Sequence, residues 1–66
     1  MSEFTKEVKI ALVMKGMSQH KLTELVAEKI GIKPDARYIN HVILGKKKSA
    51  PVEGAIKEIL EIGGEE

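Results

Sequence analysis

The chain has 66 residues, which limits it to one small domain with a modest hydrophobic core. It has no cysteine, so disulfide bonds and thiolate metal sites are excluded, and we expect a cytoplasmic protein without metal or cofactor. The N-terminal residues are charged and no apolar run approaches the roughly 18 residues of a membrane span, so we expect neither a signal peptide nor a membrane partner. Hydrophobic residues make up 42% of the chain but only Phe4 and Tyr38 are aromatic, which predicts an aliphatic core.

The net charge of +1 is distributed unevenly along the chain. Residues 1–32 hold five lysines against four glutamates, whereas residues 33–48 hold four lysines and one arginine against one aspartate, a balance of +4. Residues 49–66 hold one lysine against five glutamates, a balance of −4. The basic centre has two interpretations: a cationic face that meets phosphates or, for the lysine run at 46–48, a solvated loop.

The apolar pattern predicts two helices in the first half of the chain. The first runs from Glu3 to Lys15, with apolar residues at helical spacing: Phe4, Val8, Ala11 and Leu12. Gly16 should end it, and Ser18 should cap a second helix that ends at Gly31. The second helix turns one stripe inward, in which the Lys29 stem lies along the edge: Leu22, Leu25, Val26, Lys29 and Ile30.

Two more helices follow a connector at residues 32–34. The proline at its end favours an extended chain before it, so Asp35 is the expected N-cap of a helix from Ala36 to Leu44, which ends at Gly45. Its buried residues should be Ile39, Val42 and Ile43. Ser49 or Ala50 caps a last helix with Pro51 in its first turn and this inward stripe: Val52, Ala55, Ile56, Ile59 and Leu60. Residues 1–62 are thus predicted to form the domain, and residues 63–66 a flexible acidic tail.

Short motifs at the helix ends share one register. The step Lys15-Gly16-Met17-Ser18-Gln19 is followed three positions on by Leu22, and the second helix ends in Gly31-Ile32. The cap, apolar and terminal positions of the third helix are then Asp35, Ile39, Val42 and Gly45. Over nearly the whole chain this pattern resembles the Cro/cI-type helix-turn-helix domains, the XRE family. It departs from that family in a second helix about one turn longer and a connector about two residues longer.

The resemblance implies an all-α, compact, lambda-repressor-like domain of four helices, in which the second and third form a helix-turn-helix. The fifth helix common in the family is absent or reduced to a few residues. The implied function is sequence-specific binding of double-stranded DNA by a small bacterial or phage-type transcriptional regulator, often a repressor. The protein would act alone or as a homodimer that reads two half-sites.

The third helix would present its outward residues to the major groove: Ala36, Arg37, Tyr38, Asn40 and His41. Arg37 suits guanine, Asn40 suits adenine, and Ala36 suits a thymine methyl group. Two of the five remain open, because Tyr38 could bond a phosphate or a base, and His41 could contact DNA or cap its own helix.

Phosphate contacts are expected at the start of the second helix and from the lysines around the third. The free N–H groups and dipole of a helix N-terminus favour an anion, and Gln19 is the best single anchor. Ser18 is expected to cap the helix and to contact phosphate. The full set is Ser18, Gln19, Lys21, Lys33, Lys46, Lys47 and Lys48.

Two rival hypotheses come from other classes of function. Catalysis or metal binding would have to use His20 with Glu24, or His41 beside Tyr38. Neither arrangement has the ligand set of a zinc site or a nucleophile with a base. We therefore expect no enzyme and no small-molecule substrate. A protein-binding module, such as an antirepressor or an antitoxin-like partner, would use the second apolar face of the first helix: Ile10, Val13 and Met14. We expect these three residues to pack on the second helix, with a dimer or partner surface as the alternative.

Overall fold

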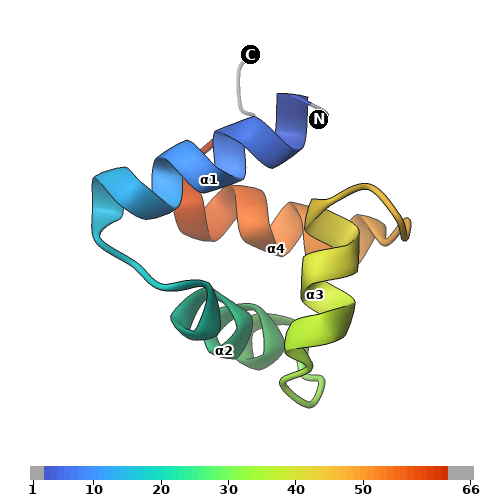
Figure 1. Ribbon diagram of the computed structural model, residues 1–66. Helices are drawn as coiled ribbons and strands as arrows, with labels where there is room; N and C mark the ends of the chain where they lie inside the picture. Colours follow the sequence, from blue (N-terminus) through green and yellow to red (C-terminus); the bar gives the residue numbers. More distant parts are fainter. Residues whose placement is uncertain (1–2, 63–66) are drawn as a thin grey trace.

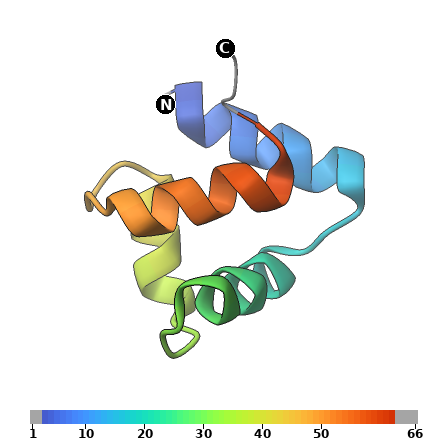
Figure 2. The same ribbon diagram turned by 180° about the vertical axis from the view of Figure 1, so that it is seen from behind.

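The computed structural model describes residues 3–62, and within this range all regular structure is helical (Figure 1). The helices are α1 (Glu3–Lys15), α2 (Gln19–Ile30), α3 (Ala36–Ile43) and α4 (Ala50–Leu60). The two opposite views show α4 between α1 and α2, with α3 standing across one side of the molecule (Figures 1 and 2). α4 packs most extensively against α2 and also contacts α1 and α3, in a compact all-α domain.

The helix boundaries follow local backbone chemistry and agree closely with the sequence predictions. The side chains of Ser18, Asp35 and Ser49 accept hydrogen bonds from backbone N–H groups of the first turns of α2, α3 and α4. Gly16 and Gly31 follow α1 and α2 with positive φ angles of 64° and 74°. The predicted tail at residues 63–66 lies outside the described residues.

The core is aliphatic, as predicted. Its fully buried members come from all four helices and include Val8, Leu22, Val26, Ile39, Val42, Val52, Ile56 and Leu60. The two aromatic side chains, Phe4 and Tyr38, are only partly buried and pack at the edge of this cluster. Each buried aliphatic side chain contributes about 1.5–3 kcal/mol relative to exposure, so the core is the main source of stability for so short a chain.

The inward stripe of α2 differs in part from its prediction. Leu25 is half-buried, while Thr23 and Ala27 are buried in addition to Leu22 and Val26. Lys29 is exposed, and its Nζ lies 2.8 Å from the Oε1 of Glu58 on α4. The buried stripe of α2 is therefore shifted toward Thr23 and Ala27 relative to its prediction.

The expectation that the second apolar face of α1 packs on α2 is wrong. Ile10, Val13 and Met14 are 58%, 80% and 80% exposed. The reason is the course of the chain after Gly16, which carries α2 to the far side of α4 and leaves α1 covered on one side only (Figure 1).

Candidate nucleic-acid interface

The site begins where α2 and α3 meet. The two helices pack against each other and are joined by residues 31–35, a longer connection than the three or four residues typical of a helix-turn-helix. The N–H groups of Gly31 and Ile32 both donate to the carbonyl of Ala27, at 2.8 Å and 2.9 Å. Asp35 then caps α3, so both ends of the connector are fixed by hydrogen bonds.

A side-chain hydrogen bond joins the start of α2 to the middle of α3. The Nε2 of Gln19, the first residue of α2, donates to the Oδ1 of Asn40 at 2.9 Å. The sequence assigned Gln19 to phosphate and Asn40 to a base, and the structure brings the two together although they are 21 positions apart. An amide nitrogen carries two N–H groups, so Gln19 keeps one donor for a further acceptor.

The other residues expected to read bases differ in their exposure. Ala36 and Arg37 are exposed in the first turn of α3. Tyr38 packs against the hydrophobic core and is half-buried, as are Asn40 and His41. Tyr38 fell near the edge of the helix face, where periodicity alone could not decide its direction.

His41 does not cap its own helix through its side chain. The carbonyl of His41 accepts the backbone N–H groups of Lys46 at 2.8 Å and Lys47 at 3.2 Å, while the N–H of Gly45 donates to Val42. This turn requires the left-handed conformation of Gly45, whose φ is 83°. Because backbone donors already occupy these carbonyls, the half-buried side chain of His41 remains beside α3 for other contacts.

A buried threonine holds the same end of α3 and was missed by the sequence analysis. The Oγ1 of Thr5, on α1, donates to the carbonyl oxygen of Ile43 at 2.6 Å, and Thr5 is 1% exposed. The last carbonyls of a helix lack partners within the helix, so this bond satisfies one of them. The available signal was the position of Thr5 three residues before Val8, on the inward stripe of the first predicted helix.

The cationic residues are exposed and lie around α3. Lys33 precedes the helix, while Lys46, Lys47 and Lys48 follow it, and all four are exposed, as is Lys21 on α2. An eight-residue helix spans about 12 Å, close to the width of the DNA major groove of about 12 Å. Exposed lysines precede and follow α3 in the chain.

Part of the lysine run lies beside other elements. Lys47 and Lys48 line a pocket together with Phe4 and Glu53. Glu53, in the first turn of α4, adds a negative charge to this end of the basic surface, which the count of charges along the chain did not indicate. Lys33 and Lys46, which do not line this pocket with Glu53, are therefore the better candidates for phosphate contacts beside α3.

His20 and Glu24, one of the pairs considered for catalysis, are exposed on α2. The Nε2 of His20 is 3.2 Å from the Oε2 of Glu24, four residues later on α2, with side-chain exposures of 81% and 50%. Within residues 3–62 no group of three histidine or acidic side chains is placed to hold a metal ion. In the same range, no helix has the length and apolar character needed to cross a membrane.

Comparison with known proteins adds no relative: no family model, no curated protein and no solved structure matches this chain. The resemblance to the XRE family therefore stands on the motifs of the sequence. The features available for a functional assignment are the Gln19–Asn40 pair, the exposed Arg37 and the cations at both ends of α3.

Proposed function

We propose that this protein binds double-stranded DNA in a sequence-specific manner, with α3 in the major groove, and acts as a small transcriptional regulator. The observation that carries the proposal is the hydrogen bond from Gln19 to Asn40, 2.9 Å long and exposed. It joins two amide side chains from different helices, and both amides keep N–H groups for an external acceptor. The proposal agrees with the XRE-type motifs at Gly16–Gln19 and at 35–45.

The pair explains how Asn40 would read a base. An asparagine contacts adenine by donating from Nδ2 to N7 and accepting at Oδ1 from the N6 amino group. Gln19 occupies one of the two lone pairs of Oδ1 and so fixes the plane of the amide. The second lone pair and both N–H groups of Asn40 remain for the base, and less side-chain freedom is lost on binding.

The remaining residues have complementary roles. Arg37, exposed in the first turn of α3, is the candidate for a bidentate contact to guanine. Lys21, Lys33 and Lys46 supply attraction to phosphates that does not depend on sequence. The N-terminus of α2, capped by Ser18, presents its free N–H groups to a phosphate beside Gln19.

Selection from a random pool of duplex DNA tests this function. The wild-type chain should enrich a motif, and Asn40→Ala should lose the preference at one position, a change of about 1–3 kcal/mol in discrimination. Gln19→Ala should weaken the same preference without moving it, because it frees the Asn40 amide. Lys9→Ala is the matched control, since this exposed lysine on α1 lies outside the proposed interface.

Two results would count against DNA reading. One is the absence of any enriched motif at low salt, and the other is an enriched motif that Asn40→Ala leaves unchanged. Either result would favour the alternative function, a protein-binding module such as an antirepressor or an antitoxin-like partner that uses Ile10, Val13 and Met14 on α1.

A further inference from the structure

An acidic side chain stands at the start of α3, beside residues proposed to face DNA. Asp35 is the N-cap of α3 and is exposed, as are Ala36 and Arg37 directly after it. Both views show the 31–35 connector, which ends in Asp35, at the end of the molecule opposite α1 (Figures 1 and 2). The recognition helix of a helix-turn-helix contacts base edges with its N-terminal residues, so Asp35 adjoins the part of α3 that would meet the bases.

Capping uses only one of the two carboxylate oxygens of Asp35. Its Oδ1 accepts the backbone N–H of Tyr38 at 3.2 Å. Within residues 3–62, Oδ2 has no hydrogen-bond or ion-pair partner, although Lys33 and Arg37 are each two positions away in the chain. The cap therefore restricts the orientation of the carboxylate and leaves Oδ2 as a free acceptor.

The negative charge is not needed for the cap itself. Serine and asparagine cap helices about as well as aspartate, and Ser18 and Ser49 cap α2 and α4 in this chain. A carboxylate close to DNA is repelled by phosphates and opposes the attraction of the neighbouring Lys33. A negative charge at this position also interacts favourably with the helix dipole, which is the purely structural alternative for Asp35.

We propose that Asp35 is a further base-reading residue, whose Oδ2 accepts a hydrogen bond from the N4 amino group of cytosine. The inference rests on the proposed function, because it requires the start of α3 in the major groove. A carboxylate only accepts hydrogen bonds, and cytosine presents only a donor on its major-groove edge. Guanine presents two acceptors there, thymine presents one, and adenine presents an acceptor beside its amino group. Asp35 therefore favours cytosine at one position and weakens binding to unrelated sequences through its charge.

Selection from random duplex DNA with the wild type and Asp35→Asn tests this role. The asparagine keeps the cap and the shape of the side chain but replaces the free acceptor with an amide donor. The wild type should enrich cytosine at one position. Asp35→Asn should lose this preference by about tenfold, the value of one hydrogen bond to a charged group, and should keep the positions that depend on Arg37 and Asn40.

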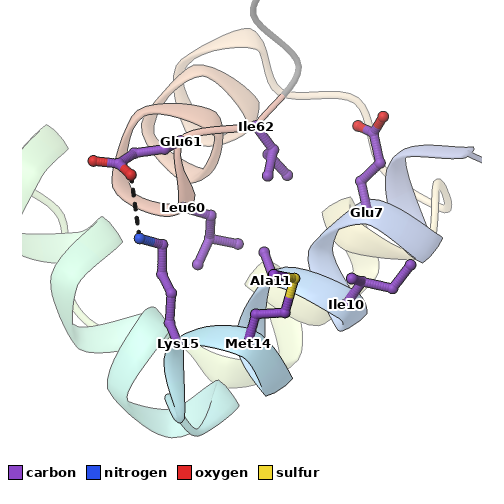
Figure 3. A pocket seen from close by; sticks show the side chains of 8 residues that line it. All are labelled: Glu7, Ile10, Ala11, Met14, Lys15, Leu60, Glu61 and Ile62. Atoms are coloured by element: carbon purple, nitrogen blue, oxygen red, sulfur yellow. Dashed lines mark hydrogen bonds and ion pairs between the residues drawn. The ribbon is translucent and has the colours of Figure 1, made fainter.

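Glu61→Gln is the matched control, because it makes the same carboxylate-to-amide change on another part of the molecule. The Oε1 of Glu61, at the end of α4, lies 3.3 Å from the Nζ of Lys15 on α1 (Figure 3). Both ribbon views place this end of α4 on the side away from α3 (Figures 1 and 2). Salt at about 0.1 M screens exposed charges beyond about 10 Å, so only Asp35→Asn should raise the affinity for unrelated duplexes.

Titration of the selected duplex adds a second measurement. Replacing its cytosine–guanine pair with thymine–adenine should weaken the wild type about tenfold and leave Asp35→Ser, which also retains the cap, unchanged. A motif that is identical in the wild type and in Asp35→Asn overturns the cytosine contact and leaves the proposed function standing. Loss of the whole motif in both Asp35 variants assigns this residue to the cap alone and also overturns the contact. A wild type that enriches no motif overturns both proposals.

Discussion

The hydrogen bond from Thr5 to Ile43 gives the sharpest test of how α3 is held. Thr5→Val keeps the shape of the side chain but removes the hydroxyl that donates at 2.6 Å to the Ile43 carbonyl. The net value of such a bond is about 0.5–1.5 kcal/mol, and a buried carbonyl left without its donor costs about 1–3 kcal/mol. Since Thr5 is 1% exposed, water cannot replace the hydroxyl without rearrangement, and we expect a loss of about 2 kcal/mol in unfolding free energy.

The matched variant is Thr5→Ser, which keeps the hydroxyl and removes one methyl group. It should cost about 0.8 kcal/mol, the value of one buried CH₂ group, and therefore less than Thr5→Val. Urea denaturation followed by circular dichroism measures both, with an unchanged m-value as evidence that the unfolded state is unaffected. In a domain of this size a loss of about 2 kcal/mol corresponds to a fall in Tm of roughly 8–16 °C.

The order of the unfolding free energies of Thr5→Val and Thr5→Ser tests whether the hydroxyl holds α3. If Thr5→Val were as stable as the wild type, or if Thr5→Ser were the more damaging change, the hydroxyl would not hold α3. Amide hydrogen exchange adds a local measurement, because Thr5→Val should expose the last turn of α3 more than the interior of α2.

Two further predictions concern the turn after α3 and the proposed DNA surface. Gly45→Ala should destabilise the fold by about 1–2 kcal/mol, because the φ angle of Gly45 is 83°. Gly54→Ala, in the interior of α4, should stabilise the fold by about 0.5–1 kcal/mol, because an added Cβ meets nothing within 4 Å. Thermal unfolding measures both variants, and an equal effect of the two substitutions would contradict the backbone argument. Arg37→Ala should relax the preference at one base, whereas Lys46→Ala should weaken binding to all sequences alike and lower the salt dependence of log K by about 1. Titrations with matched and unrelated duplexes separate the two effects, and equal losses for both variants would contradict the proposed placement of α3 in the major groove.

Helix boundaries could be predicted because they depend on nearby residues. Ser18, Asp35 and Ser49 cap their helices through bonds to residues three positions on, and the glycines that end α1 and α2 adopt the expected positive φ. The third helix ends at Ile43, one residue before its predicted end, because Leu44 serves as its C-cap. Such features involve a few consecutive residues, so the sequence contains all the groups that take part.

Contacts between helices could not be predicted in the same way. The Gln19–Asn40 and Thr5–Ile43 bonds join residues 21 and 38 positions apart, and both depend on the course of the connectors. The exposure of Val13 has the same origin, since periodicity showed that the first helix has two apolar faces but not which of them the rest of the chain would cover.

The position of α3 depends on the rest of the domain more than on its own sequence. Isolated helices shorter than about 12–15 residues are marginal in water, and α3 has eight. Three contacts compensate for this: the burial of Ile39, Val42 and Ile43, the turn at Gly45, and the bond from Thr5. Arg37 and Asn40 are attached to the exposed side of a helix that the core holds in place. The proposed base-reading surface would keep its geometry only while the domain is folded. If the proposal holds, DNA affinity should fall together with stability in core variants and independently of stability in Arg37 and Asn40 variants.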